Sequence, residues 1–130
     1  MAITEVDRLS AGKYLLLTTF RKDGTPVPTP VWVTRDDDRL LVWTGASSGK
    51  VKRIRRDGHV ELAPCDARGK ATGPAVAGSA QLLDEVGTAT AKQLIVKKFP
   101  LTGRLLILAS TIRRGARGTV GIAIEPSTNG

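Results

Sequence analysis

The stretch KYLLLTTFRKDGTPVPTPVWVT, residues 13–34, contains the pattern that decides the fold. Its first part, Tyr14–Phe20, is rich in leucine, threonine and aromatic residues and predicts a buried strand. Arg21–Gly24 is a typical turn, so the stretch as a whole predicts a hairpin. Three prolines then alternate with other residues, at Pro26, Pro28 and Pro30. Because proline lacks an N–H group, this second arm is predicted to be an edge strand or a bulged strand.

Strand and turn signals continue along the rest of the chain. Four more strands are predicted, at 39–44, 59–64, 74–83 and 119–125. Helices are predicted at 4–11, from Ser47 or Ser48 as the N-cap to Asp57, at 86–99 and at 104–112. Six or so antiparallel strands joined by tight hairpins predict a mainly β fold with short helices, in the form of a closed or partly split barrel.

Length and composition predict one domain over residues 1–130. A chain of 130 residues fits a single domain, and its apolar residues are mainly valine, leucine, isoleucine and alanine, which predicts an aliphatic core. The first residues lack the features of a secretory signal, and no apolar run reaches the length of a membrane span. We therefore expect a cytoplasmic protein with no membrane span.

The cysteine and histidine content argues against a metal centre. Cys65 and His59 are the only residues of these two types in the chain, and together they cannot assemble a zinc site of known ligand spacing. Cys65 is predicted to be a small buried residue, and His59 a structural residue rather than an acid or a base. We therefore expect no bound metal.

The net charge of +8 predicts an anionic ligand. Five basic residues fall close together, at Lys50, Lys52, Arg53, Arg55 and Arg56. Phosphates, nucleic acid, acidic membranes and acidic small molecules all fit such a charge. Nucleic acid is the weakest of these candidates, because surfaces that bind it usually combine basic residues with stacking aromatic residues, and no aromatic residue lies between 50 and 56.

A phosphate site is predicted where the strand at 39–44 ends and the next helix begins. Thr44 is followed by a loop of small residues that contains Ser47 and Ser48, and then by Lys50 and Arg53. The free N–H groups and the dipole of a helix N-terminus favour an anion, and Lys50 and Arg53 would share one helix face. A solvated basic helix explains the same residues equally well from spacing alone.

The proline-rich arm allows two interpretations. Pro28–Val33 could form a rigid, flat wall whose backbone groups bond the polar edge of a planar heterocycle. Alternatively, the prolines protect an edge strand from aggregation, and this interpretation is favoured by the residues alone. Trp32 and Trp43 are expected in the core or at a dimer interface rather than stacked on a cofactor.

Taken jointly, these motifs resemble a known family. The resemblance covers roughly residues 13–83 and the closing residues 121–126, and it rests on Lys13–Phe20, Asp23–Trp32, Leu41–Thr44, Gly49–Asp57 and Ala63–Gly69. The chain resembles the actinobacterial, F420-dependent branch (flavin/deazaflavin oxidoreductase group B) of the pyridoxamine-phosphate-oxidase-like superfamily. The resemblance implies a split β-barrel of the FMN-binding type, which forms a homodimer with two cofactor sites at the subunit interface.

The resemblance also implies which residues bind the cofactor. Its phosphate would lie against the loop and helix near Lys50, and its tricyclic ring would lie along the strand near Val31. The expected cofactor-binding residues are Pro30, Val31, Trp32, Thr44, Ser47, Ser48, Lys50, Lys52 and Arg53. The implied reaction is hydride transfer from reduced F420, a deazaflavin, to an electron-poor small molecule. The excess of basic residues favours F420, which carries a phosphate and a polyglutamate tail, over FMN.

Two alternative functions also fit the sequence. An FMN-dependent enzyme of the same fold fits the same residues, and so does a protein that binds F420, a flavin or a tetrapyrrole without turnover. No residue stands out as a general acid or base, as expected where a cofactor supplies the chemistry. Residues 86–117 match no motif and are expected to shape the substrate entrance or the dimer contact, so the substrate is not readable from the sequence.

Overall fold

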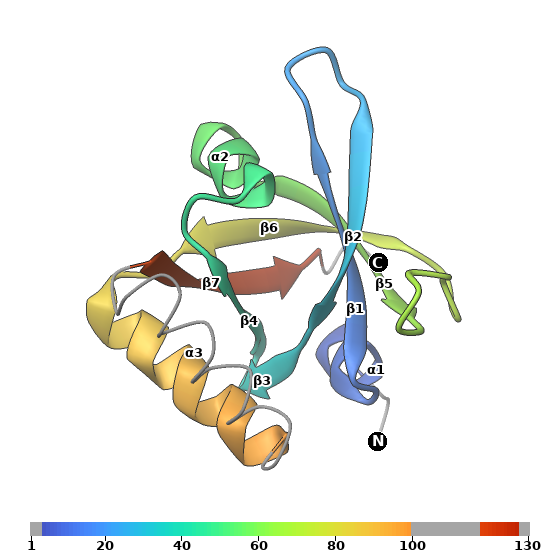
Figure 1. Cartoon of the computed structure of the whole chain (residues 1–130). Helices are drawn as coiled ribbons and strands as arrows, with labels where there is room; N and C mark the ends of the chain where they lie inside the picture. Colours follow the sequence, from blue (N-terminus) through green and yellow to red (C-terminus); the bar gives the residue numbers. More distant parts are fainter. Residues whose placement is uncertain (1–3, 100–117, 128–130) are drawn as a thin grey trace.

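One antiparallel sheet of seven strands dominates the structure (Figure 1). This computed structural model describes residues 4–99 and 118–127. The strands are β1 (Tyr14–Phe20), β2 (Pro26–Trp32), β3 (Thr34–Asp36), β4 (Arg39–Gly45), β5 (His59–Cys65), β6 (Val76–Leu82) and β7 (Thr119–Pro126). Their order across the sheet is β2-β1-β5-β6-β7-β4-β3, and every neighbouring pair is antiparallel. The expected mainly β fold is therefore confirmed.

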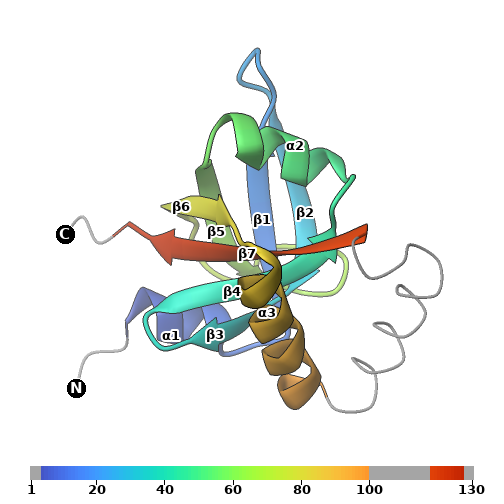
Figure 2. The same ribbon diagram turned by 90° about the vertical axis from the view of Figure 1, so that its left-hand side faces the viewer.

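The sheet curls because one short segment of chain supplies both of its edges. β2 and β3 are separated by Val33 alone, yet they lie at opposite ends of the strand order. The chain can pass directly from one edge to the other only if the sheet bends until the edges approach, as Figure 1 and Figure 2 show. This arrangement confirms the predicted split β-barrel, and the bend at Val33 adds a short seventh strand to the six or so expected.

The barrel interior is aliphatic, as the composition predicts. Alternate residues of β1 are buried, so Leu15 and Leu17 point into the barrel and have no exposed surface. They form one cluster with Val6, Leu9, Val33, Leu40, Val42, Ile54, Val60, Leu62, Ala80, Ile122 and Ile124. Because burial of one large aliphatic side chain contributes about 1.5–3 kcal/mol, this cluster is the main source of stability.

Three helices are described outside the barrel: α1 (Glu5–Ser10), α2 (Gly49–Arg56) and α3 (Glu85–Lys98). α2 buries Val51 and Ile54, as its spacing predicts. α3 packs against β3, β4 and β7 and crosses the outside of the sheet (Figure 2). All three correspond to predicted helices, whereas the helix predicted at 104–112 lies outside the described residues.

The start of one strand differs from its prediction, and one predicted N-cap is confirmed in position but not in its side-chain bond. β6 begins at Val76 rather than Pro74, because Pro74 has no N–H to donate to a ladder. The Pro74 carbonyl instead accepts a bond of 3.0 Å from Nη1 of Arg8. Ser48 does occupy the N-cap position of α2, but its hydroxyl makes no bond to the helix, so it does not cap in the usual way.

An ion pair joins α1 to β3. Arg35 Nη1 donates to Oδ1 of Asp7, and Asp7 also accepts a bond from the backbone N–H of Thr4 within a capping box. The bond from Arg35, followed by the bonds from Thr4, lowers the pKa of Asp7 to about 2. A lowered carboxyl pKa stabilises the fold above the ordinary pKa, and this contribution is lost as the pH falls toward the lowered value.

Asp7→Asn should therefore reduce stability in a pH-dependent way. Asparagine keeps an acceptor for Thr4 but loses the charge that Arg35 binds. The difference between wild type and variant, measured by urea unfolding, should be constant above about pH 5 and shrink as the pH falls from 3.8 toward about 2. Asp38→Asn, which removes an exposed carboxylate in the neighbouring turn, is the control. A difference that persists unchanged to the lowest pH would contradict a role for the charge.

Candidate functional site

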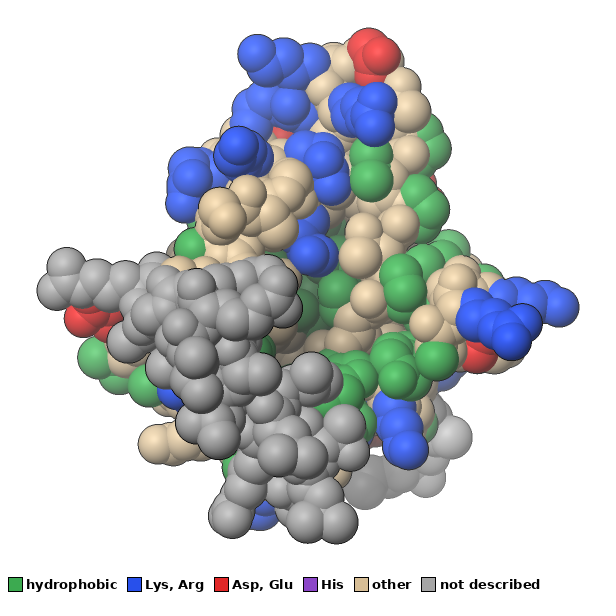
Figure 3. All heavy atoms as spheres, viewed as in Figure 1, with side chains coloured by type: hydrophobic (Ala, Val, Ile, Leu, Met, Phe, Trp, Pro, Cys, Tyr) green, Lys and Arg blue, Asp and Glu red, His purple; other side chains and the backbone are tan. Residues whose placement is uncertain are grey.

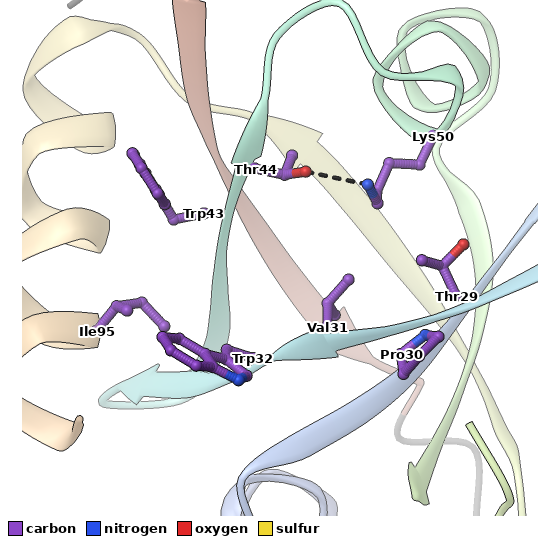
Figure 4. A pocket seen from close by; sticks show the side chains of 8 residues that line it. All are labelled: Thr29, Pro30, Val31, Trp32, Trp43, Thr44, Lys50 and Ile95. Carbon is purple, nitrogen blue, oxygen red and sulfur yellow. Dashed lines mark hydrogen bonds between the residues drawn. The ribbon is translucent and has the colours of Figure 1, made fainter. Parts of the chain in front are cut away.

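A cavity of about 270 Å³ lies where the barrel is split, between β2 and β4 (Figure 4). α2 contributes at one end and α3 at the other. The lining residues are Thr29, Pro30, Val31, Trp32, Trp43, Thr44, Lys50 and Ile95. Five of these were predicted to bind the cofactor: Pro30, Val31, Trp32, Thr44 and Lys50. The remaining predicted residues, Ser47, Ser48, Lys52 and Arg53, do not line this cavity.

The backbone direction of β2 follows from two hydrogen bonds at the ends of the hairpin. Val33 N donates to Lys13 O at 3.2 Å, and Arg21 N donates to Thr25 O at 2.9 Å. In the β1–β2 register these are pairs of odd-numbered residues, so odd-numbered residues of β2 direct their backbone groups toward β1. The even-numbered residues direct theirs toward the open edge, and they include Pro26, Pro28 and Pro30.

The open edge of β2 therefore offers acceptors and no donors from Pro26 to Pro30. Each proline presents a carbonyl but has no N–H. The β3–β4 ladder ends at the pair Thr34 and Leu41. Beyond it, β2 has no N–H at Pro30 or Pro28 with which to continue the pairing along β4. The prolines thus keep the barrel split, and the resulting edge, which we call the proline edge, fits a ligand that brings its own N–H donor.

The other side of the cavity is polar and basic. Lys50 Nζ, from the first turn of α2, donates to Oγ1 of Thr44 at 3.0 Å, in a partly buried position (Figure 4). Because a threonine hydroxyl both accepts and donates, Thr44 can receive this bond and still give its own proton to a ligand. The pair places a positive charge and a hydroxyl donor at one end of the cavity.

Ser48, two residues before Lys50, has a side chain without a hydrogen-bond partner among the described residues. It is the N-cap residue of α2, yet its hydroxyl oxygen is buried and has no partner among the described residues. A buried hydroxyl without a partner costs about 1–3 kcal/mol. The N-terminus of a helix also favours an anion through its free N–H groups and its dipole. These residues therefore fit a phosphate-bearing group.

The other predicted basic residues have different surroundings. Arg53 Nε donates to Oγ1 of the buried Thr19 at 2.6 Å, so Lys50 and Arg53 bond different partners although they share the predicted helix face. Burial, followed by the positive charges of Arg21 and Arg56, lowers the pKa of Arg53. Lys52 and Ser47 are exposed.

An aromatic wall, formed by Trp32, Trp43, Ile95, Val96 and Phe99, packs beside the cavity as a cluster separate from the barrel core. Trp32 stacks on Phe99 with ring centres 4.6 Å apart and planes inclined by 21°. The indole nitrogen of Trp43 is buried and has no acceptor within the described part of the chain. Ile95 belongs to the segment 86–117 that was expected near the substrate entrance or the dimer contact, but neither Ile95 nor Trp43 was predicted individually to line the cavity. Helical or strand spacing reveals a buried face but not what this face contacts.

A basic surface borders the cavity on the side of α2 and the β1–β2 hairpin (Figure 3). Its exposed members are Arg21, Lys22, Lys52, Arg55 and Arg56. None of the ion pairs in the described part of the chain includes these residues. The surface therefore presents positive charge to an anion larger than a single phosphate.

Cys65 and His59 lie outside the cavity. Cys65 is buried, and this burial, followed by the charge of Asp66, raises the pKa of its thiol, which makes it a poor nucleophile. His59 is exposed and stacks on Phe20 with ring centres 5.3 Å apart. Both residues thus have the surroundings predicted for structural residues.

Residues 4–99 and 118–127 show neither a membrane-spanning helix nor a cluster of metal ligands. No helix in these ranges has the length and apolar character needed to cross a membrane. Within the same ranges, no three or more His, Cys, Asp or Glu residues form a group that could hold a metal ion.

A family model described as pyridoxamine 5'-phosphate oxidase matches residues 4–116. No curated protein matches the chain significantly. Solved structures with the same fold include a conserved hypothetical protein of Mycobacterium tuberculosis, which is 19% identical with a TM-score of 0.67; the match covers 97% of this chain and 85% of that one.

Two further solved structures have names that state a ligand. An FAD-binding protein of Mesorhizobium loti is 17% identical with a TM-score of 0.62, over 93% of this chain and 84% of that one. A haem storage protein of Vibrio cholerae is 11% identical with a TM-score of 0.64, over 90% of this chain and 83% of that one. At sequence identities this low, the structural similarity establishes a shared fold and nothing about the ligand of this chain.

Proposed function

Because the chain belongs to the pyridoxamine 5'-phosphate oxidase family, we propose that it is an oxidoreductase with a flavin-type cofactor in the cavity between β2 and β4. The cofactor we favour is coenzyme F420, which in its reduced form would supply a hydride to an electron-poor small molecule. FMN is the alternative cofactor for the same site.

The observation that carries the proposal is the two-sided chemistry of the cavity. One side has the proline edge, which accepts hydrogen bonds, and the adjoining aromatic wall. The other side has the Lys50–Thr44 pair, with the unpartnered hydroxyl of Ser48 nearby at the N-cap of α2. A flavin or deazaflavin has matching groups, namely a flat ring with an N–H in its plane and a phosphate.

The expected roles follow from this division. Pro30, Val31 and Trp32 would contact the ring, and Thr44 and Lys50 would bind at the phosphate side. Ser48 would donate its hydroxyl to the phosphate, and Ser47 would lie in the same loop. Lys52 and Arg53 do not line the described cavity, so their proposed contribution is positive charge near the phosphate rather than contact with the ring.

The basic surface supports F420 over FMN. FMN needs charge at the phosphate site alone, whereas the tail of F420 carries several carboxylates beyond its phosphate. Exposed side chains such as Arg55 and Arg56 follow Lys50 on α2 and can attract such a tail through charge, without fixed geometry.

The lining of the cavity indicates what the protein itself does. Among its described lining residues there is no carboxyl and no imidazole. The chain's own part is then to bind and orient the cofactor and to exclude water from one face of the ring. The same observation supports a second candidate, a protein that binds a flavin, F420 or a tetrapyrrole without turnover. The structural likeness to a haem storage protein is consistent with this second candidate.

We further propose that a second copy of the chain completes the site. The described cavity of about 270 Å³ is slightly smaller than most ligand pockets, which measure about 300–1,000 Å³. A cavity of this size would cover a tricyclic ring incompletely. A homodimer with the cavity at its interface would cover the remaining face of the ring.

Titration of the purified protein with F420 and, separately, with FMN tests the proposal. We expect F420 to bind with a dissociation constant of about 1 μM or lower and FMN to bind more weakly.

Light scattering on the same sample should give twice the chain mass of 13.8 kDa. Reduced F420 with a panel of electron-poor small molecules then separates an enzyme from a binding protein, because the latter gives binding without turnover. Tighter binding of FMN than of F420 would make FMN the cofactor of this site. If neither compound binds, the proposed function is refuted.

A further inference from the structure

Lys98, the last residue of α3, uses all three of its N–H donors on backbone carbonyls. Its Nζ donates to Ser10 O at 2.8 Å, to Gly12 O at 2.7 Å and to Val33 O at 2.8 Å. Burial lowers the pKa of this ammonium group. None of the ion pairs in the described part of the chain includes Lys98, so carbonyl oxygens rather than a carboxylate bind its charge.

The three carbonyls belong to places that are far apart in the sequence. Ser10 ends α1, and Gly12 lies in the turn before β1. Val33 is the bend at which the chain leaves β2 and begins β3, directly beside the split. A single ammonium group therefore ties the end of α3 to the start of β1 and to the end of β2.

The residues next to these contacts belong to the aromatic wall of the cavity. Phe99 follows Lys98 in the chain, and its ring centre lies 5.6 Å from Lys98 Nζ. Trp32, on which Phe99 stacks, precedes Val33. The bond from Lys98 to Val33 thus joins the two chain segments that carry the two stacked rings.

The aromatic wall depends on α3 for its position. Ile95, Val96 and Phe99 come from the end of this helix or directly follow it, and the cluster they form is separate from the barrel core. At the other end of α3, Oγ1 of Thr88 accepts a bond from Gly121 N at 2.9 Å. The helix is therefore bonded to the barrel near both ends, and Lys98 provides the contact at the end that carries the wall.

We propose that Lys98 is a positioning residue, which sets the place of the aromatic wall and so the width of the ring-binding side of the cavity. That the bound ring is a flavin or deazaflavin rests on the proposed function. The role of Lys98 in positioning the aromatic wall does not depend on the proposed function.

The test compares Lys98→Met with wild type, using two probes. Lumiflavin is a flavin ring without phosphate, and pyrophosphate is an anion without a ring. We expect the dissociation constant of lumiflavin to rise about tenfold in Lys98→Met, because the loss of the charge-assisted bonds displaces the aromatic wall that contacts the ring. The dissociation constant of pyrophosphate should stay unchanged. Lys98→Arg should restore part of the lumiflavin affinity because guanidinium also donates to carbonyls. Lys97→Met removes an exposed neighbouring charge and serves as the matched control.

A readout without any ligand follows the wall directly. Trp32 and Trp43, both in the wall, are the two tryptophans of the chain, so acrylamide quenching of their fluorescence reports its packing. Lys98→Met should increase quenching at a temperature where circular dichroism shows an intact fold. If Lys98→Met lowers the unfolding temperature but leaves both the quenching and the lumiflavin affinity unchanged, the proposal is overturned. Equal losses for lumiflavin and pyrophosphate would also overturn it. If wild type binds no flavin, the proposed function fails, while the quenching comparison still decides the role of Lys98.

Discussion

Lys50→Met is expected to weaken binding of the phosphate-bearing cofactor about 10- to 100-fold while the fold stays intact. A hydrogen bond to a charged group contributes about 1.5–3 kcal/mol, and each 1.4 kcal/mol is a factor of ten in affinity. Lys50 Nζ lies at the cavity, where it bonds Thr44, and the N-cap of α2 with its unpartnered Ser48 hydroxyl lies two residues before it. Calorimetric titration with F420 and FMN measures the loss.

Lys52→Met is the matched control for this variant. It removes the same charge from the same helix, but its side chain is exposed and does not line the cavity. We expect a small loss of affinity that disappears at high salt, because long-range attraction between exposed charges is screened. Lumiflavin, which has no phosphate, should bind Lys50→Met as it binds wild type. Equal losses in the two lysine variants would show that the basic surface attracts the anion without a defined phosphate site.

Gly121→Val is expected to destabilise the fold by about 3 kcal/mol or more, because overpacking of a tight contact costs about 1–3 kcal/mol for smaller insertions. Gly121 lies in β7 where α3 crosses the sheet. A Cβ at this position would meet Cβ of Ala91 at 3.0 Å and Cδ1 of Leu83 and Cα of Thr88 at 3.1 Å. The helix backbone at Thr88 cannot yield as a flexible side chain does. Thermal unfolding should therefore show a midpoint lowered by roughly 10 °C or more.

Gly12→Val provides the comparison for this substitution. A Cβ at Gly12 has no heavy atom within 4 Å, so this variant should unfold near the wild-type temperature. Gly121→Ala should lie between the two, because it adds one carbon to the same contact. Since α3 carries part of the aromatic wall, Gly121→Val should also increase tryptophan quenching. A wild-type unfolding temperature in Gly121→Val would mean that α3 does not pack on β7 as described.

Local patterns were sufficient for most of the fold. The composition of Tyr14–Phe20 and the turn at Arg21–Gly24 predicted the first hairpin, which the register of β1 and β2 reproduces. The prolines predicted an edge strand, and β2 is an edge of the sheet. The buried pair Val51 and Ile54 predicted the packed face of α2. These predictions succeeded because each depends on residues close in sequence.

The predictions about the site can be compared with the positions of the residues. The resemblance pointed to nine cofactor-binding residues, and the structure brings Pro30, Val31, Trp32, Thr44 and Lys50 together around one cavity. Whether they bind a cofactor stays a prediction. Helical spacing suggested that Lys50 and Arg53 act together, but Arg53 bonds Thr19, a residue of β1 that the sequence does not relate to α2. The single domain over residues 1–130 and the cytoplasmic location also stay predictions.

The sequence by itself determined the strands, the turns, the edge character of β2 and the positive charge of α2, since these follow from side-chain periodicity, proline chemistry and local composition. Tertiary structure alone decided that β2 and β3 form opposite edges of one curled sheet, which opens the cavity. It also decided that Ile95 lines that cavity and that Lys98 meets the carbonyls of Ser10, Gly12 and Val33. The physical reason is that these features depend on how the whole sheet bends and on contacts between distant segments, such as the Lys98 bonds across 65 to 88 residues, rather than on any local preference.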